Sequence, residues 1–466
     1  MSSRQGPLGL QSSRTSDATI HSRSPPPATP VFTGAFFDRT PDAARARAAY
    51  FKVLAGGLVL LTITIFAVLS IYWGALWRTD RFIHNLNGWI VDFDGGDIGA
   101  AVVQNFLAVR GEPMKISWEV RPASDFPNGV DDLAQAVIGE RCWVALSSRH
   151  ILRLLHYVTK WHSVNTNATA RLNAAVASLD ANYDGTSAVT AFGVEARNED
   201  AYRVLLKPNI DIPMDQFSFN FANQFARTLI SRQIDISTVL STAPQLITRP
   251  AYFTLRNLRP FDIPVASAVT FVGLIYLLII SFIAAGIANG ARLAAGFEQR
   301  LSLPSLISTR IVTSISMYFI LSLFYSLQSL AFQLPFHRRF GHPGFLVFWM
   351  LMWFGMTALG LAVEAMFTLL TPRFIPFFLV LWIISNVSTC FYPLETLPAF
   401  YRYGYASPFY NVSRGIRTVV FSTRNMLGLN FGVLIAWIAV SCITIPLTSW
   451  FARSRQIAAL RSQKQQ

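Results

Sequence analysis

Three aspartates stand within the stretch VDFDGGDIG: Asp92, Asp94 and Asp97. Carboxylates at this spacing could bind a cation or perform acid–base chemistry. A calcium loop of the EF-hand type beginning at Asp92 would have an oxygen ligand, a glycine and a glutamate at its fifth, sixth and twelfth positions. The chain has Gly96, Asp97 and Val103 there, so it departs from the motif at all three. We therefore interpret the stretch as a strand end, a glycine turn and a helix starting at Ile98 with Asp97 as its N-cap.

Another carboxylate, Glu364, lies in the apolar segment GLAVEAMF. An ionisable group inside a membrane is costly and commonly faces the interior of a helix bundle, so we predict that Glu364 carries a proton or contacts a cationic substrate during transport. The alternatives are an interior hydrogen bond or nearness to the membrane surface, because the segment ends about six residues later, roughly 9 Å along a helix. Gln328 and Asn386, in neighbouring apolar segments, are candidate polar partners, for which interhelical hydrogen bonding is the simpler role.

The sequence lacks the motifs of several enzyme classes. It has no P-loop motif G-x-x-x-x-G-K-[ST], no Gly-Lys dipeptide and no serine in a G-x-S-x-G elbow. Three histidines stand six residues apart, which is not the i, i+4 spacing of a zinc pair: His150, His156 and His162. Three cysteines do not make a disulfide framework. We predict no catalytic residue, no metal and no cofactor, and therefore no enzyme.

Six apolar segments must position these residues. Of the 466 residues, 52% are hydrophobic and 14% are charged, against about 45–50% and about 25% in soluble domains. The segments long enough to cross the roughly 30 Å hydrocarbon layer are residues 53–77, 265–288, 311–334, 345–370, 374–392 and 431–451. The sequence therefore predicts an α-helical membrane protein with six transmembrane helices, one followed by five.

The charge distribution predicts the orientation in the membrane. The net charge is +14, yet residues 78–262 hold 18 basic and 19 acidic groups, so the excess lies in the N-terminal tail and in residues 263–466. Basic residues beside apolar segments orient a chain in a membrane, which argues against nucleic-acid binding. The positive-inside rule then places both termini in the cytoplasm and the region between helices one and two outside it.

The predicted organisation has five parts. Residues 1–52, rich in Ser, Pro and Arg, form a disordered cytoplasmic tail, and residues 53–77 form helix one. Residues 78–264 mix strand-like and helix-like patterns, which predicts an α+β extracytoplasmic domain. Residues 265–451 form a five-helix membrane domain, and residues 452–466 form a basic cytoplasmic tail.

Three stretches resemble, in the same order, the fungal nitrosoguanidine-resistance family of membrane proteins: NLNGWIVDFDGGDIGAAVVQNFL, AVTAFGVEARNEDAYRVLLKPNI and RPFDIPVASAVTFVGLIYLLII. That family is related to the bacterial phage-infection-protein family, and the resemblance covers about residues 45–455. It implies resistance to toxic compounds by export or by altered lipid arrangement, at the plasma membrane or, alternatively, in an endomembrane. The implied partners are membrane lipids and a small-molecule or lipid substrate, and a homo-oligomer is left open.

The loop FYPLETLPAFYRYGYASPFYNVSRGIRTVVF resembles the corresponding loop of type-2 ABC exporter membrane domains. Its notable residues are Pro393, Pro398, Pro408, Arg414 and Arg417. We predict that Pro393 and Pro398 end the fifth helix, and that a short re-entrant or interfacial helix with both arginines on one face forms an outer gate. The alternative is an amphipathic surface loop. Without a P-loop, energy comes from another subunit or is not needed, and the resemblance to a stand-alone family favours the second.

Three N-x-[ST] sequons occur, at Asn167, Asn386 and Asn411. Asn386 lies inside an apolar segment and Asn411 lies close to the membrane, so neither suits glycosylation. Asn167, in the extracytoplasmic domain, is the predicted glycosylation site.

Two further function classes stay open. A non-transporting scaffold or regulator would bind a partner through its extracytoplasmic domain, although five bundled helices exceed what an anchor needs. An ecto-enzyme would need a nucleophile–base set or a metal set, and residues 78–262 show neither.

Overall fold

The computed structural model describes residues 36–37, 39–108, 114–148, 167–370 and 373–464. The chain forms two compact units, residues 1–62 and residues 63–466. The first contains most of helix α1 (Pro41–Thr64), which begins twelve residues before the predicted start of helix one. Proline at the first helical position and Asp42 in the first turn suit a helix N-terminus. Residues 41–52 are therefore helical, which the prediction of a disordered tail to residue 52 missed.

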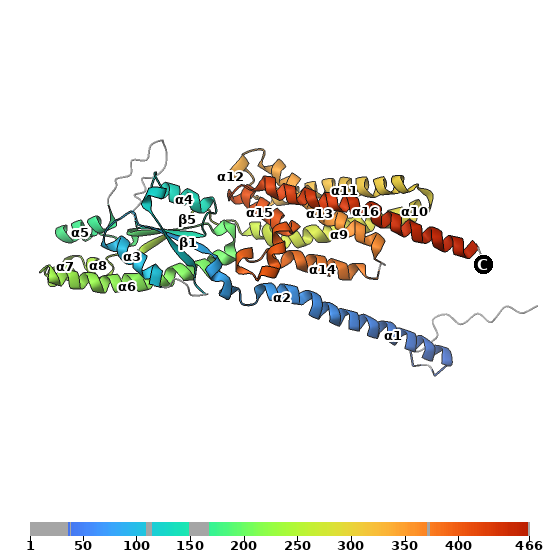
Figure 1. The fold of residues 1–466 in the computed structure, drawn as a ribbon, viewed down its shortest axis with the longest axis horizontal. Helices are drawn as coiled ribbons and strands as arrows, with labels where there is room; N and C mark the ends of the chain where they lie inside the picture. Colours follow the sequence, from blue (N-terminus) through green and yellow to red (C-terminus); the bar gives the residue numbers. More distant parts are fainter. Residues whose placement is uncertain (1–35, 38, 109–113, 149–166, 371–372, 465–466) are drawn as a thin grey trace, which may run out of the picture. The chain divides into compact units, whose positions relative to one another are not determined.

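The second unit begins with the continuation of this helix and then forms a domain around a five-stranded sheet (Figure 1). We call residues 79–262 the sheet domain. Its strands are β1 (Asn87–Val91), β2 (Ser117–Arg121), β3 (Val144–Ser147), β4 (Val189–Gly193) and β5 (Phe253–Asn257). Their order is β2-β1-β3-β4-β5, and every pairing is parallel except that of β3 with β4. The three inner strands are apolar and buried almost throughout, as in a sheet covered on both faces.

Helices cover both faces of this sheet. They are η2 (Thr79–Asn85), α3 (Asp97–Ala108), α4 (Val130–Ile138), α5 (Ala168–Ser178), α6 (Lys207–Ser231), α7 (Ile236–Thr242) and α8 (Gln245–Thr248). One core joins α3, α5 and α6 to the sheet around Phe106 and Trp118, and a second joins α4 to the other face around Trp89 and Leu133. Because β2 and β3 lie on opposite sides of β1, the carboxyl end of β1 is a topological switch point, where such sheets commonly bind ligands.

The aspartate turn lies at this switch point. Asp92 accepts hydrogen bonds from the backbone N–H of Asp94 (2.8 Å) and from the hydroxyl of Ser148, which follows β3 (2.7 Å). Asp94 is buried and accepts from the backbone N–H of Thr169 (2.9 Å) and from its hydroxyl (2.5 Å). Protein donors therefore occupy these carboxylates, and no group of three His, Cys, Asp or Glu side chains in the described residues could hold a metal ion.

The cap of helix α3 differs from the prediction. Asp97 is the first residue of the helix and is exposed. The backbone N–H of Gly99 donates to Asp94 (3.3 Å), and that of Ile98 donates to the hydroxyl of Thr169 (3.0 Å). Asp94 and Thr169 therefore satisfy the first-turn donors, and the prediction of Asp97 as N-cap is wrong. Thr169 stands 71 positions from Ile98, so no local pattern contains this contact.

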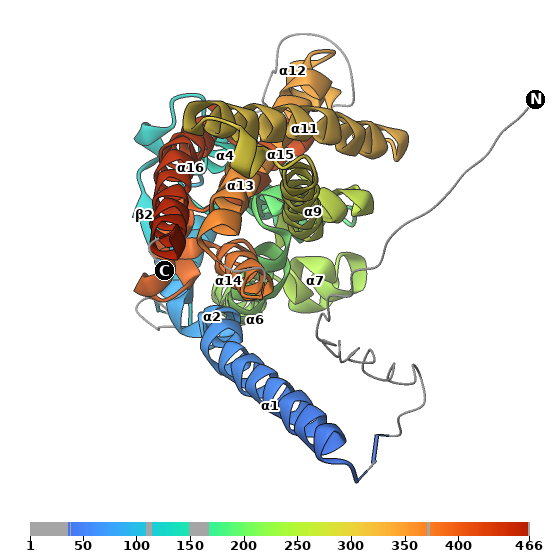
Figure 2. The ribbon, with the colours of Figure 1, turned by 90° about the vertical axis from the view of Figure 1, so that its right-hand side faces the viewer.

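The remaining elements form a helical bundle. In order they are α2 (Ser70–Leu76), η8 (Ala268–Val272), α9 (Gly273–Ala294), α10 (Phe297–Arg300), α11 (Leu303–Ala331), α12 (His337–Phe340), α13 (Gly344–Leu369), α14 (Ile375–Val387), η9 (Leu394–Thr396), η10 (Ala399–Ala406), α15 (Pro408–Phe421) and α16 (Leu427–Lys464). Helix α13 is central and contacts α9, α11, α15 and α16, as an end view shows (Figure 2). We call the end that contacts the sheet domain the domain end, and the opposite end the far end.

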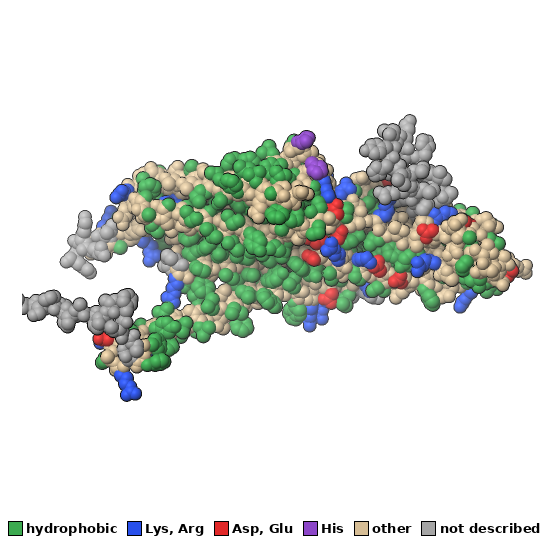
Figure 3. Space-filling view, turned by 180° about the vertical axis from the view of Figure 1, so that it is seen from behind, with side chains coloured by type: hydrophobic (Ala, Val, Ile, Leu, Met, Phe, Trp, Pro, Cys, Tyr) green, Lys and Arg blue, Asp and Glu red, His purple; other side chains and the backbone are tan. Residues whose placement is uncertain are grey.

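Five helices among the described residues are long and apolar enough to cross a membrane: Pro41–Leu76, Pro264–Ala294, Leu303–Ala331, Gly344–Leu369 and Leu427–Ala459. Hydrophobic side chains dominate the bundle surface, whereas charged side chains gather over the sheet domain (Figure 3). The predicted segment 374–392 contains α14, whose 13 residues reach about 20 Å, less than the roughly 30 Å hydrocarbon layer. A multi-pass helical membrane protein is confirmed, while the sixth span and the orientation stay predictions.

Candidate functional site

Helix α15 is a buried helix at the domain end of the bundle. Twelve of its fourteen residues are buried, and it packs against α12, α13, α16 and η8. An amphipathic surface loop would leave one face uncovered, so this alternative does not fit. Pro408 stands at its first turn, where a missing N–H costs nothing.

The prolines before α15 do not end the fifth predicted helix. Helix α14 already ends at Val387, and Pro393 and Pro398 directly precede the 3-10 helices η9 and η10 instead. The prediction that they stop the helix is therefore wrong. The fixed φ of proline suits the start of each short helix. Together, η9 and η10 connect α14 to α15.

Asn386 ties α14 to the start of α15. Its side-chain oxygen accepts from the hydroxyl of Ser407 (2.8 Å) and from the backbone N–H of Phe409 (3.3 Å). Its amide nitrogen donates to the carbonyl of Trp382 (2.9 Å). The side chain is buried, and both its oxygen and its nitrogen have protein partners, so interhelical hydrogen bonding, the simpler of the two predicted roles, accounts for it.

Arg414 and Arg417 connect α15 to the sheet domain. Arg414 pairs with Glu140 at 2.5 Å, and Arg417 pairs with Glu199 at 2.5 Å. Arg417 also donates to the carbonyl of Ala196 (3.1 Å). The two arginines, three positions apart on one helix face, therefore reach two carboxylates that lie far apart in the sequence.

Glu140 occupies a strained position. Helix α4 ends in a Schellman motif in which the N–H of Arg141 bonds to the carbonyl of Ala136, and Glu140 takes the left-handed conformation with φ of 58°. Glycine normally stands at this position, and another residue there costs about 1 kcal/mol. The conformation places the buried carboxylate against Arg414, so the ion pair offsets the strain.

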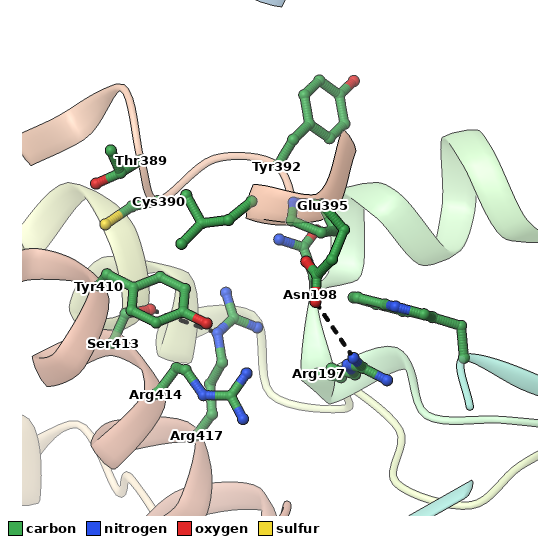
Figure 4. Close-up of a pocket in the computed structure, with 13 residues that line it drawn as sticks. Arg197, Asn198, Thr389, Cys390, Tyr392, Glu395, Tyr410, Ser413, Arg414 and Arg417 are labelled. Carbon is green, nitrogen blue, oxygen red and sulfur yellow. Dashed lines mark hydrogen bonds and ion pairs between the residues drawn. The ribbon is translucent and has the colours of Figure 1, made fainter. Parts of the chain in front are cut away.

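A third arginine lies at the same junction (Figure 4). The guanidinium of Arg197 stacks on Trp143, 3.4 Å from the ring centroid, and donates to the carbonyl of Cys142 (3.2 Å). Its nitrogens lie 3.9 Å from both Glu140 and Glu395. Burial lowers the pKa of Arg197, while the two carboxylates act in the opposite direction.

The space among these groups is small. It measures about 40 Å³ and is lined by both α15 arginines, Arg197 and Glu395. Such a volume has room for a water molecule or two and none for a drug-sized compound. Burial raises the pKa of the neighbouring Cys142 thiol to about 12, so this thiol is not a nucleophile at neutral pH. The junction is therefore suited to hold two parts of the protein together.

Further contacts extend the junction. Arg338 of α12 forms a bidentate pair with Asp262, with both distances 2.9 Å, and this hydrogen bonding lowers the pKa of Asp262. The side chain of Asn198 donates to the carbonyl of Phe391 (2.9 Å). Arg259 donates to the carbonyl of Ser422, just after α15 (3.2 Å). The sheet domain therefore forms polar contacts with the segments before and after α15 as well as with the helix itself.

Glu364 lies in a second, separate cluster at the far end of the bundle. Its carboxylate accepts from Arg292 (2.6 Å) and from Arg310 (2.8 Å), and all three side chains are buried. Arg310 also donates to the backbone carbonyl of Glu364 (2.8 Å) and to the hydroxyl of Ser449 (2.9 Å). The cluster links α9, α11, α13 and α16. In it, the guanidinium groups of Arg292 and Arg310 both contact the carboxylate of Glu364.

The predicted partners of Glu364 are elsewhere. Asn386 is bound at the domain end, and Gln328 is exposed near the domain end of α11. The partners that the structure shows are Arg292 and Arg310, which stand within α9 and α11. Glu364 is thus an enclosed ion-pair centre in this structure, with its cationic contacts supplied by the protein itself.

The sequons differ in their surroundings. Asn167 is exposed at the N-terminus of α5, and its side chain makes no capping hydrogen bond. Asn386 and Asn411 are both buried. Glycosylation at Asn167 stays a prediction, and burial explains why the other two are unsuitable. The histidines at 150, 156 and 162 lie outside the described residues.

Together the fold and the two clusters define a multi-pass membrane protein whose sheet domain is fastened to a buried helix of the membrane bundle. The chain belongs to the DUF3533 family, which is described as a family of proteins of unknown function and matches residues 57–443. It is 23% identical over 433 residues to an uncharacterized endoplasmic reticulum membrane protein of Saccharomyces cerevisiae, covering 87% of this chain and 81% of that protein. No solved structure matches the chain. The nitrosoguanidine-resistance and exporter resemblances therefore stay predictions.

Sequence reasoning missed the sheet-domain half of the junction. Arg197, Asn198 and Glu199 all stand in the stretch VEARNEDAYR, which resembles a segment of the predicted family. The concentration of charged residues directly after a buried strand was the available signal. Their later partners, Phe391, Glu395 and Arg417, follow 190 or more positions along the chain, so only the folded chain shows the contacts.

Proposed function

We propose that the protein confers resistance to toxic amphipathic compounds by moving them, or membrane lipids, through its helical bundle without an ATPase of its own. One observation carries this proposal: α15 is buried in the bundle, and the sheet domain holds it through two ion pairs. Because α15 also packs on α13 and α16, a displacement of the sheet domain would displace the centre of the bundle. An anchor for a soluble domain has no need of such a link.

We further propose that the chain crosses the endoplasmic reticulum membrane six times, with the sheet domain in the lumen and both termini in the cytoplasm. The location follows that of the yeast relative. Helix α14 supplies the fifth crossing, since eleven of its thirteen residues are apolar and its length of about 20 Å falls less short of the reticulum bilayer, about 27 Å, than of an average one. Five crossings would put the termini on opposite sides. A reporter at the C-terminus tests this, because it must lie opposite Asn167.

In this proposal the Glu364 cluster closes the far end. Breaking a buried ion pair from one side costs about 3–5 kcal/mol, so the four helices that it links stay together until another interaction compensates. A substrate group or a displacement passed on by α15 would supply that compensation. This role differs from an open cation site, because two guanidinium groups already donate to one oxygen of the carboxylate.

The experiment is a growth test in a strain that lacks the gene, across alkylating agents, azoles and lipid-directed toxins. The strain is complemented with wild type, with Arg417→Gln, or with Lys207→Gln, which removes a surface ion pair with Asp211. We expect wild type and Lys207→Gln to restore growth, and an equally abundant Arg417→Gln protein to fail. Full rescue by Arg417→Gln would remove the proposed link. A deletion strain with no sensitivity would favour the scaffold or regulator function instead.

A further inference from the structure

A groove lies between α9 and α11 at the domain end of the bundle. Its volume is about 420 Å³, and residues 265–280 and 325–334 line it. Most of the lining is apolar. Two aromatic side chains in it are more than half exposed: Tyr276, within a span, and Phe332, directly after one. The groove therefore opens sideways from the bundle, toward the surroundings of the membrane-crossing helices. Its volume is in the range of small-molecule sites.

Backbone irregularity accompanies the groove. The π-helix η8 runs from Ala268 to Val272, directly before Gly273. A Cβ at position 273 would lie 2.3 Å from the hydroxyl oxygen of Tyr325 on α11. Glycine there lets the tyrosine lie against the α9 backbone. π-Turns within helices often occur at functional sites, because they change which side chains face a neighbour.

One polar side chain in the groove has no protein partner. Within the part of the chain that the structure describes, the amide of Gln328 makes no hydrogen bond with protein. The neighbouring Ser329 hydroxyl donates to the carbonyl of Tyr325 (3.1 Å). This amide is exposed and lies near the end of its helix, so it is free to hydrogen-bond a polar group of a ligand that enters the groove.

We infer that the groove binds one acyl chain of a membrane phospholipid, with the ester region of the lipid at Gln328. The lining runs from Val265 to Ile280 along one helix, about 22 Å, which exceeds the roughly 15 Å thickness of one hydrocarbon leaflet. Gln328 lies three positions before the end of α11, and Ile280 lies deeper in the bundle. This order of polar and apolar lining matches a lipid that enters from the leaflet beside the sheet domain.

A phospholipid bound here would be a substrate of the proposed transport, and this transport role rests on the proposed function. Binding itself can be measured separately. The purified full chain is placed in phosphatidylcholine liposomes that contain a phosphatidylcholine with a photoactivatable diazirine near its acyl-chain end. After irradiation, the labelled peptides are mapped by mass spectrometry. We expect labelling to concentrate on residues 265–280 and 325–334, above the level of the other spans.

Two matched variants test the position of the site. Ile280→Trp fills the groove, whereas Ile283→Trp places the same side chain on the same helix outside the lining. We expect Ile280→Trp to reduce groove labelling to the level of the other spans and Ile283→Trp to leave it unchanged. Gel filtration and thermal unfolding verify that both variants fold. A third variant, Gln328→Leu, should move the labelled positions along the groove, because the ester region loses its partner.

Several results would overturn the inference. Even labelling of all exposed spans in wild type would mean that the groove holds only bulk lipid. Equal groove labelling in both tryptophan variants would place the lipid elsewhere, and cross-links between two copies at these peptides would make the groove a dimer contact. Failure here leaves the proposed function standing if Arg417→Gln still abolishes resistance. Conversely, groove labelling without any resistance phenotype would support lipid binding and reject the proposed function.

Discussion

The ion pair between Arg417 and Glu199 offers the most direct test of how the sheet domain is fastened to the bundle. The two side chains are 7% and 12% exposed, and their nitrogen and oxygen lie 2.5 Å apart. Arg417→Gln leaves Glu199 as a buried charge without its cation. Breaking such a pair from one side costs about 3–5 kcal/mol, because the remaining charge has lost its water and gained nothing in return.

Replacing both residues removes both charges together. The free energy of unfolding of the Arg417→Gln, Glu199→Gln double variant should therefore fall by less than the sum of the two single changes, by about 1–3 kcal/mol. Reversible unfolding in sodium dodecyl sulfate, followed by tryptophan fluorescence, measures all four proteins. The matched control is Lys207 with Asp211, an exposed pair four positions apart on α6, for which the coupling should be near zero and at most about 1 kcal/mol.

Additivity would refute the reasoning. If the two single changes at the junction sum to the double change within about 0.5 kcal/mol, Arg417 and Glu199 do not interact across a dry interface. The sheet domain would then contact the bundle without being held to α15 by this ion pair. The proposed function would lose the link between the two parts on which it is argued.

Three further changes have defined outcomes. Glu364→Gln leaves Arg292 and Arg310 without a counter-charge, so we expect a loss of about 3–5 kcal/mol in the same unfolding assay; stability within about 1 kcal/mol of wild type would contradict the enclosed cluster. Enzymatic deglycosylation should shift the gel mobility of wild type and not of Asn167→Gln, and a shift that persists in the variant would point to another site. At pH 8 a maleimide should not label Cys142 in the folded protein, because burial holds its thiol protonated with a pKa of about 12; rapid labelling there would mean that the junction opens.

The same raised pKa has a consequence for stability. The folded thiol stays protonated above the pH at which the unfolded thiol ionises, near 9. The unfolded state then binds fewer protons than the native state, so this group lowers the free energy of unfolding as the pH rises above about 9.

The far-end and domain-end clusters differ in how they join helices. The Glu364 cluster links four helices within the bundle, whereas the α15 arginines link the bundle to a domain outside it. A transport cycle that alternates between the two ends would have to weaken one set of contacts while it keeps the other. The π-helix η8 lines the groove beside α9 and also packs against α15, so the groove and the junction share an element.

Much of the membrane part could be predicted because a span is a local property. The four long apolar runs after residue 263 that lie near 265–288, 311–334, 345–370 and 431–451 all form helices, since continuous apolar composition over that length has few other stable states in a bilayer. The run at 374–392 was equally apolar, yet its helix ends at Val387. There Asn386 turns its side chain to the start of α15, a contact that hydropathy does not contain.

The sequence by itself determined the class of this protein, its apolar spans, the short helix after residue 407 and the strand and turn around Asp92. Each of these depends on neighbouring residues. Tertiary structure alone decided that Glu364 meets Arg292 and Arg310, that Thr169 caps α3, and that two arginines of α15 reach the sheet domain. The physical reason is that a buried charge is stable only beside an opposite charge, and the folding of distant segments decides which residue supplies it. Arg417 and Glu199 stand 218 positions apart, and only packing brings them within hydrogen-bond distance.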